Sequence, residues 1–539
     1  METSAEALVG LRCVVRSKLC CLAFLAMKIA VEGCAHGELD MIYSSLENIQ
    51  QRDNIKVDLL LCCGDFQAVR NEMDLQCMAV PAKYRKMCSF YKYYSGEKRA
   101  PILTLFIGGN HEASNHLWEL PFGGWVAPNI YYLGYSGVVN FGGLRIAGLS
   151  GIYKHHDYNK GHFESPPFNN NTMRSIYHVR SLDAFKLKLL SNPVNIVMSH
   201  DWPKGVYHYG NLDELYRWKG FLRQEIEENT LGSSAAEDVL RSLQPDHWFS
   251  AHLHVRFPAR IQHSQTSKVT NFLALDKCLP KRKFLEVIDV GPASGPLELS
   301  YDAEWLAITK LTLPFVNTEP SHTQLPLSRE EITKLKPTQD TIQELSDLMG
   351  NDLSIPHNFT QNAPLYDAAN HQRFVRVTTS TNPQTDFFCQ RLKMRNPFWE
   401  TDLLEGTLTE NPDEINLSDE DEEMKNYNSS TFSLNLPEPT EKKESGKETG
   451  LISNAASDQS ENVSYSTSDE AEKNTFSEKE GDSSTASKSV FEEKESVEDS
   501  TSSEQDKDVS SSGYEPPTKT FKLKRRNQAI YTASEDSDS

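Results

Sequence analysis

Four short polar signatures each follow a short apolar, strand-like stretch, and this repeated arrangement constrains the fold more than any other feature of the chain. The apolar runs span residues 28–31, 57–63, 101–107 and 194–198. Loops after buried strands are where open α/β sheets place their functional sites, so the four signatures are expected to form one site. In chain order they are Gly33-Cys34-Ala35-His36, Gly64-Asp65, Gly109-Asn110-His111-Glu112, and Ser199-His200 followed by Ala251-His252-Leu253-His254.

The side chains of these signatures are nitrogen, oxygen and sulfur donors of the kinds that borderline divalent metals prefer. A carboxylate with two oxygens can bridge two cations, which makes Asp65 the expected centre of a two-metal site. Taken singly, each histidine is more often a surface residue or a satisfied core residue than a ligand. Together and in this order, the candidate metal ligands are Cys34, His36, Asp65, Asn110, His200, His252 and His254.

The order of these signatures resembles that of the calcineurin-like metallophosphoesterases, with two departures. Cys34 stands where the first aspartate is usual, and Ala251 stands where the last signature usually begins with glycine. Both departures, together with residues 104–116 and 273–280, resemble the family of RNA lariat debranching enzymes. The resemblance runs from Met27 to about Lys283 and returns briefly at residues 524–531. It implies an α/β fold, a four-layer α-β-β-α sandwich, with a C-terminal domain packed on the catalytic one.

The resemblance also assigns roles to two residues of the site. His111 would protonate the leaving oxygen and stabilise developing charge; the alternative is a structural histidine bonded to Glu112 or Asp201. Cys34 would ligate as a soft thiolate, which favours Zn²⁺ or Fe²⁺ over Mg²⁺. The implied cofactors are two divalent metal ions, drawn from Fe²⁺, Zn²⁺ and Mn²⁺.

Residues 153–180 interleave aromatic rings with lysine, histidine and arginine, the mixture that single-stranded RNA binding needs for stacking and phosphate contact. The resemblance implies a lariat-recognition insertion over residues 150–180, whereas the plainer interpretation is an ordinary solvated loop. The candidate RNA-binding residues are Tyr153, Lys154, His155, Tyr158, Lys160, His162, Phe163, Arg174, Tyr177 and Tyr207.

Charged residues are distributed unevenly along the 539-residue chain. Residues 401–539 hold 34 acidic and 14 basic residues, whereas residues 1–400 hold 42 and 41, so the body is nearly neutral and permits an RNA partner. The tail is rich in serine and poor in aromatic residues, a composition that predicts disorder. Its basic run at residues 522–526 resembles a nuclear localisation signal, and the tail is a candidate contact for other RNA-processing proteins.

The expected organisation is an N-terminal extension outside the core (1–26), a catalytic domain (27–263), a C-terminal domain (264–400) and the acidic tail (401–539). Helices are predicted over residues 38–51, 80–96, 328–336 and 341–350, and a hairpin followed by a strand over 140–151. Ten cysteines without a C-x-x-C spacing indicate a reduced, intracellular protein. No apolar stretch reaches the roughly 18 residues of a membrane span. The short apolar run at residues 19–27 could pass for a secretory signal, but Lys28 interrupts it.

The predicted function is hydrolysis of the 2′-5′ phosphodiester at the branch of an excised intron lariat, in the nucleus, with branched RNA as the partner. Two alternatives remain open from the sequence. One is another two-metal phosphodiesterase or nuclease of the same fold. The other is an RNA-binding homologue with weak or lost catalysis.

Overall fold

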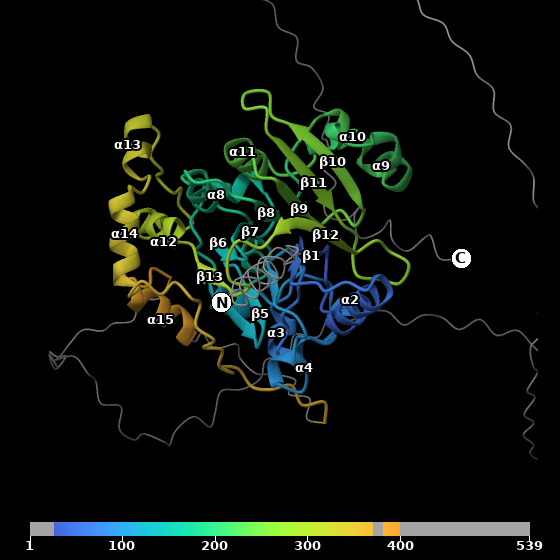
Figure 1. The fold of residues 1–539 in the computed structure, drawn as a ribbon. Coiled ribbons are helices and arrows are strands. Elements are labelled where there is room, and N and C mark those ends of the chain that lie inside the picture. Colours follow the sequence, from blue (N-terminus) through green and yellow to red (C-terminus); the bar gives the residue numbers. More distant parts are fainter. Residues whose placement is uncertain (1–25, 370–380, 399–539) are drawn as a thin grey trace, which may run out of the picture. The chain divides into compact units, whose positions relative to one another are not determined.

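The computed structural model describes residues 26–369 and 381–398. The predictions made for residues 1–25, for the tail at 401–539 and for its basic run at 522–526 lie outside the described residues. Within the described ranges, the chain forms two β-sheets with helices against them (Figure 1).

The first sheet has six strands, of which β1, β2, β3 and β5 are parallel neighbours, while β12 and β4 are antiparallel edges. Three of the apolar runs of the sequence form its centre, because parallel strands covered on both faces need continuous apolar residues. In spatial order the strands are β12 (Leu285–Pro292), β1 (Ala26–Glu32), β2 (Leu59–Cys62), β3 (Thr104–Phe106), β5 (Ile130–Tyr132) and β4 (Gly124–Ala127).

The second sheet has seven strands, of which β11, β9, β8 and β7 are parallel to one another, while β10 and β6 pair with β11 and β7 antiparallel. The predicted hairpin is present as β6 and β7, but it begins at Ser136, so residues 140–151 hold its turn and second arm and no separate strand follows within them. In spatial order the strands are β10 (Phe257–Gln262), β11 (Val269–Ala274), β9 (His247–Ser250), β8 (Ile196–Ser199), β7 (Leu144–Leu149), β6 (Ser136–Phe141) and β13 (Ser300–Tyr301).

Successive side chains of a strand point to opposite faces of its sheet, and each face packs against a different layer. In β1, Ile29 and Val31 belong to one apolar cluster, which also contains Ile196 and Phe249 of the second sheet, so this cluster lies between the two sheets. Ala30 points the other way, into a cluster with residues of α2 (Leu39–Asp53) and α4 (Phe90–Ser95). The outer face of the second sheet packs against α8 (Ser181–Lys188) and α11 (Ser234–Leu243). The predicted four-layer α-β-β-α sandwich is therefore confirmed (Figure 1).

The segment after residue 264 contributes strands as well as helices. The expected boundary at residues 263/264 falls between β10 and β11, and the strands that follow it enter both sheets. Farther along, α12 (Ala303–Leu311), α14 (Gln339–Leu348) and α15 (Pro383–Arg391) share a small apolar cluster of their own. Helix α12 connects this cluster to the second sheet, because its Trp305 and Ile308 belong to the apolar cluster on the outer face of that sheet.

The predicted helices are present with shifted bounds. Residues 38–51 form α2, residues 341–350 overlap α14, and residues 328–336 contain α13 (Arg329–Lys334), which begins with a capping box at Ser328. The stretch 80–96 is helical only at η1 (Ala82–Tyr84) and α4, because Cys88 between them adopts a left-handed conformation. The remaining short elements are α3 (Glu72–Gln76), α5 (Ser114–Trp118), α6 (His155–Tyr158), α7 (Thr172–Ser175), η2 (Val206–Tyr209), α9 (Leu212–Trp218), η3 (Gly220–Leu222), α10 (Arg223–Glu227) and η4 (Leu313–Phe315).

A search of the described residues for helices long and apolar enough to cross a membrane finds none.

Candidate metal centre

The candidate ligands follow strands that end at one edge of the sandwich. Cys34 and His36 follow β1, Asp65 follows β2, and Asn110 follows β3, all in the first sheet. From the second sheet, His200 follows β8, and His252 with His254 follow β9. Parallel strands end in the same direction, so residues separated by more than 200 positions come within contact distance.

Asp65 lies at the centre of these side chains and is 1% exposed. Its Oδ1 accepts hydrogen bonds from the backbone N–H of Asn110 (2.9 Å) and of His111 (2.8 Å). The same Oδ1 lies 3.3 Å from Nε2 of His200, while Oδ2 lies 3.8 Å from Nε2 of His36. The two carboxylate oxygens therefore face two different groups of candidate ligands.

One group contains Cys34, His36, Asp65 and His254, whose ligand atoms all lie within 4.8 Å of one another. Nε2 of His36 is 3.4 Å from Nε2 of His254. Two nitrogens that bind one tetrahedral cation at about 2.0–2.1 Å stand roughly 3.3–3.4 Å apart. The spacing and the donor types of this group thus fit one bound divalent cation.

The other group forms around His200, which is fully buried. Its Nε2 lies 3.2 Å from Oδ1 of Asn110, and its Nδ1 lies 2.8 Å from the carbonyl oxygen of Cys63. A carbonyl that accepts the Nδ1 proton leaves Nε2 free as a lone-pair donor. The ring of His252 stands 4.9 Å from that of His200. These residues fit a second cation next to the first.

The electrostatics favour ligation by the histidines in their neutral form. Burial lowers the pKa of His36 and of His252 to about 3, and it lowers the pKa of His254 well below its ordinary value. Burial raises the pKa of Asp65, but the surrounding histidines, His200 first, outweigh burial and lower it. At neutral pH the site therefore presents Asp65 as a carboxylate and His36, His252 and His254 as neutral imidazoles, as a cation site requires.

Cys34 differs from the other ligands because burial, followed by the charge of Asp65, raises the pKa of its thiol well above the ordinary value. Its Sγ accepts a hydrogen bond from the backbone N–H of His252 at 3.2 Å. A thiol in this position becomes a thiolate only when a cation replaces the proton, so binding of a metal here would release a proton.

The backbone at the site is tightly constrained. A side chain on Gly109 would place its Cβ 2.3 Å from Oδ1 of Asp65, and one on Gly64 would place it 2.4 Å from Nδ1 of His200. The glycines of both signatures thus allow the backbone to approach the ligands. In addition, four candidate ligands adopt left-handed conformations that are unfavourable for side-chain-bearing residues: His36, Asp65, His252 and His254.

Sequence reasoning did not assign roles to two residues that support the ligands. The buried carboxylate of Glu112 accepts backbone N–H bonds from Phe66, Gln67 and Gly109, all at 2.8 Å, and so joins the loops after β2 and β3. Nε2 of Gln67 lies 3.0 Å from Nδ1 of His36. Glu112 belongs to a recognised signature, but nothing in the sequence around Gln67 marks it.

His111 lies at the margin of the two groups and is partly exposed. Its ring contacts that of His36 edge-on, with centroids 5.3 Å apart. Burial lowers its pKa, and the nearby charge of Asp65 opposes that effect. His111 is therefore close enough to act on a substrate held at the site.

Residues 150–180 form a segment that adjoins the site and is held in place by hydrogen bonds. The backbone N–H of Gly151 donates to the carbonyl of Gly108, and that of Tyr153 donates to Oδ2 of Asp201, the neighbour of His200. Nδ1 of His178 lies 2.6 Å from Oδ2 of Asp157, which joins the end of the segment to its beginning. The interpretation as an ordinary solvated loop does not fit this network of internal contacts.

The ten candidate RNA-binding residues differ in how far their side chains are exposed to solvent. Tyr207 is fully buried in the core, where its hydroxyl donates to Asn229, so its ring offers no face for a base. His162 is largely buried, stacked on Tyr135 and 2.8 Å from Asp183. The other eight are exposed or partly exposed: Tyr153, Lys154, His155, Tyr158, Lys160, Phe163, Arg174 and Tyr177.

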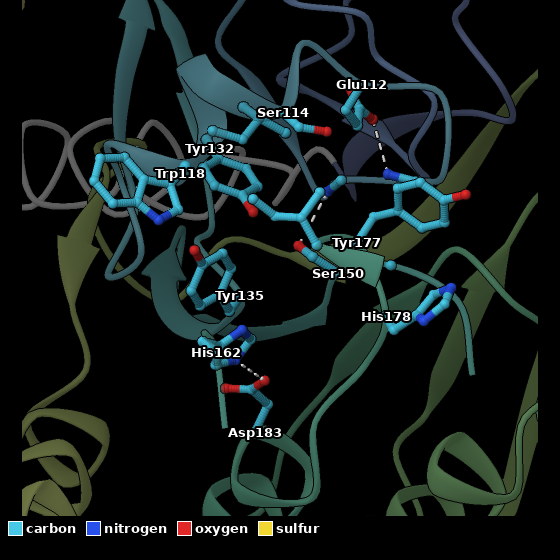
Figure 2. Close-up of a pocket in the computed structure, with 15 residues that line it drawn as sticks. Glu112, Ser114, Trp118, Tyr132, Tyr135, Ser150, His162, Tyr177, His178 and Asp183 are labelled. Atoms are coloured by element: carbon cyan, nitrogen blue, oxygen red, sulfur yellow. Dashed lines mark hydrogen bonds and ion pairs between the residues drawn. The ribbon is translucent and has the colours of Figure 1, made fainter. Parts of the chain in front are cut away.

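A small cavity of about 40 Å³ lies between Glu112 of the loop after β3 and the 150–180 segment (Figure 2). Its wall includes Gly109 and Glu112 on the metal side and Tyr177 with His178 from the 150–180 segment. The cavity is large enough to hold water molecules. The segment and the metal-site loop therefore line one cavity together.

Comparison with known proteins agrees with this geometry in two steps. Residues 27–256 match the family model of calcineurin-like phosphoesterases, the class that the sandwich and its clustered ligands define. The chain therefore has the fold of a hydrolase that acts on phosphodiester bonds.

The second step narrows the class. Residues 267–397 match the model of the lariat debranching enzyme C-terminal domain. The chain is 44% identical to lariat debranching enzyme A of Xenopus laevis, covering 95% of this chain and 100% of that protein. It is 50% identical to the human lariat debranching enzyme (77% and 79% covered) and 51% identical to that of Arabidopsis thaliana (67% and 84%). This chain belongs to the lariat debranching enzyme family.

Proposed function

We propose that this protein hydrolyses the 2′-5′ phosphodiester at the branch point of excised intron lariats and so linearises them for turnover. The observation that carries the proposal is the position of Asp65, whose two oxygens face two separate ligand groups, within a chain of the debranching family. This arrangement suits hydrolysis of a phosphodiester between two cations.

The first cation would be held by Cys34, His36, Asp65 and His254, and the second by Asp65, Asn110, His200 and His252. Two divalent ions, when bound, supply an activated water and neutralise the phosphoryl oxygens. The thiol of Cys34 and the imidazoles favour Fe²⁺, Zn²⁺ or Mn²⁺ over Mg²⁺.

The protein's own groups complete the chemistry. His111 donates a proton to the oxygen that leaves, which on a lariat is the branch 2′-oxygen. Burial lowers the pKa of His111, and the negative charge of a bound phosphodiester opposes this effect and favours the protonated ring. Glu112 accepts three backbone hydrogen bonds and so holds the loops that carry Asp65 and Asn110 in a fixed relative position.

The accessible aromatic and basic side chains of the 150–180 segment would bind the RNA around the branch. The backbone N–H of Tyr153, next to Lys154, donates to Asp201, the neighbour of His200, and so holds the segment at the His200 side of the site. Lys154 adds to the lowering of the pKa of His252, after the larger effects of burial, His200 and Asp65.

The protein would act in the nucleus, where the basic run at residues 522–526 would direct it and the acidic tail would contact other RNA-processing proteins. A fluorescent fusion that loses nuclear enrichment when these basic residues become alanine would support this localisation. Unchanged distribution would contradict the role of the run.

The decisive experiment compares a branched RNA with its linear 3′-5′ counterpart, each incubated with purified full-length protein and Mn²⁺, Fe²⁺ or Zn²⁺ in turn. Selective cleavage of the branch is expected. Equal cleavage of both RNAs would favour a general nuclease of this fold, and binding without cleavage would favour a homologue that has lost catalysis.

Replacing Cys34 with aspartate is expected to shift the metal preference. The substitution exchanges a soft thiolate for a hard oxygen ligand, so activity should move from Zn²⁺ toward Mn²⁺ or Mg²⁺. Activity and bound metal, measured across a series of cations, test this; a Cys62→Ser variant, altered at a buried cysteine outside the ligand set, is the control. An unchanged metal profile would show that Cys34 does not coordinate in the active protein.

A further inference from the structure

A second group of potential metal ligands lies in the 150–180 segment, outside the two-metal centre. It consists of His156 and Asp157, both in α6, and His178, and their ligand atoms all lie within 4.8 Å of one another. The hydrolytic chemistry of the two-metal centre uses none of these side chains. Two imidazoles and one carboxylate are ligands that Zn²⁺ takes in three-ligand sites, where a water fills the fourth position. The group therefore has the composition of a zinc site.

The carboxylate of Asp157 is the centre of this group. Its Oδ2 lies 2.6 Å from Nδ1 of His178 and 3.1 Å from Nε2 of His156. Two donors that bind one tetrahedral cation at about 2.0–2.2 Å stand roughly 3.3–3.5 Å apart, so the spacing to His156 is close to that required. The spacing to His178 is that of a hydrogen bond. A bound Zn²⁺ would replace the proton of this bond, and the two atoms would separate by about 0.7 Å.

The group is buried on one side and open to solvent on the other. Asp157 and His178 are 3% and 7% exposed, whereas the side chain of His156 is 71% exposed. Burial lowers the pKa of His178 and outweighs the opposing effect of Asp157, so the ring is neutral at neutral pH, the form that binds a cation. The buried pair would hold the ion, and the exposed side would leave room for its entry and for a water ligand.

Two neighbouring cations orient Asp157. Nζ of Lys160 lies 2.8 Å from Oδ1, which leaves Oδ2 to face the two histidines. Nη1 of Arg180 donates to the backbone carbonyl of Asp157 at 2.8 Å. Hydrogen bonds of this kind fix the orientation of a metal ligand. Because Lys160 and Arg180 also repel a further positive charge, the affinity would depend on the two imidazoles, which favour Zn²⁺ over Mg²⁺ or Ca²⁺.

The backbone brings the two halves of the group together. His178 forms an isolated parallel bridge with Ile152. Around it, the N–H of Ile152 donates to the carbonyl of Tyr177 (3.1 Å), and the N–H of Val179 donates to the carbonyl of Ile152 (3.0 Å). The beginning and the end of the 150–180 segment therefore meet beside the group, and a cation bound there would join them through side chains as well.

We infer that His156, Asp157 and His178 bind one Zn²⁺ ion that stabilises the 150–180 segment. This site goes beyond the proposed function, which needs only the two ions of the other centre. A metal site of this kind rarely exists in the unfolded chain, so the free energy of binding the ion adds to the stability of the folded segment. Under the proposed function, the same ion would keep the aromatic and basic side chains of the segment in place before RNA binds.

The test counts the Zn²⁺ ions that full-length, metal-free protein binds in competition with a chromophoric chelator. His156→Gln should bind one ion fewer than the wild type. Loss of one of three ligands should weaken the site by more than the roughly 10–100-fold that loss of a group supporting a ligand costs. His155→Gln, altered at the adjacent exposed histidine of α6, is the matched control and should bind as many ions as the wild type.

Limited proteolysis measures the effect of the ion on the segment. Trypsin cleaves after lysine and arginine, and the segment contains Lys160 and the exposed Arg174. Zn²⁺ should slow cleavage at these residues in the wild type and in His155→Gln, but not in His156→Gln. Neither measurement requires RNA cleavage, so a wild-type protein that binds this ion but cleaves no branched RNA would refute only the proposed function.

Three results would overturn the inference. Equal numbers of bound Zn²⁺ ions in the wild type and in His156→Gln would leave Asp157 with its internal hydrogen bonds only. Loss of one ion from His155→Gln as well would place the ion on the exposed face of α6 and not in the buried group. Cleavage by trypsin at an unchanged rate with and without Zn²⁺ would show that the ion does not stabilise the segment.

Discussion

Replacing Asp65 with alanine is expected to abolish hydrolysis and to remove most of the bound metal. Its two carboxylate oxygens face the His36 and His200 groups, so one substitution removes a ligand from both cations. The loss of turnover should reach at least the roughly 10²–10⁴-fold range of a lost catalytic group, because the cations themselves are lost. Single-turnover rates on branched RNA and metal content by elemental analysis measure both effects.

Asp65→Asn is the matched control for folding. Its amide oxygen can still accept the N–H bonds of Asn110 and His111 that Asp65 accepts, while the negative charge is lost. The asparagine variant should therefore unfold at nearly the temperature of the wild-type apoprotein and still bind little metal. Near-normal debranching by either variant would refute the assignment of the metal centre.

Replacing His111 with alanine is expected to lower turnover by roughly 10²–10⁴-fold, the usual range for a lost general acid, while metal content stays the same. Metal binding should survive the loss of turnover for two reasons. The ring of His111 only contacts that of His36 from the side, and Asp65 accepts its hydrogen bond from the backbone N–H of His111, which alanine retains. Turnover of branched RNA and metal stoichiometry are compared with the wild type.

A substrate with a better leaving group gives this prediction a sharper control. An activated phosphodiester that needs no proton on its leaving oxygen should be hydrolysed nearly as well by His111→Ala as by the wild type. Loss of metal in the variant would make His111 a ligand or a structural support, and an equal loss on both substrates would exclude the proton-donor role.

The sequence determined the fold class and the set of candidate ligands, because both depend on local patterns. Apolar runs such as residues 57–63 and 194–198 contain enough signal to specify buried parallel strands. The signatures after them identify donor types in a fixed order. The departures at Cys34 and Ala251, together with residues 104–116 and 273–280, indicated the family that the comparisons show.

The pairing of strands over long sequence separations and the use of individual side chains could not be derived in this way. The β-strands after residue 264 pair with β1, β9 and β6, and these pairings over long sequence separations leave no local pattern. Tyr207 and Tyr153 look alike in sequence, yet Tyr207 is buried in the core of the second sheet and Tyr153 is partly exposed. Burial depends on which elements pack over a residue, and so only the tertiary structure decides it.

The support of the site likewise depended on the tertiary structure. The carboxylate of Glu112 reaches the backbone of two loops, and the loop after β11 lies against Cys34, more than 240 positions away. Sequence identifies which atoms can bind a cation or a base because that property belongs to each residue type. The distances between those atoms, and which of them water can reach, arise only when distant strands pair and their loops meet at one edge of the sandwich.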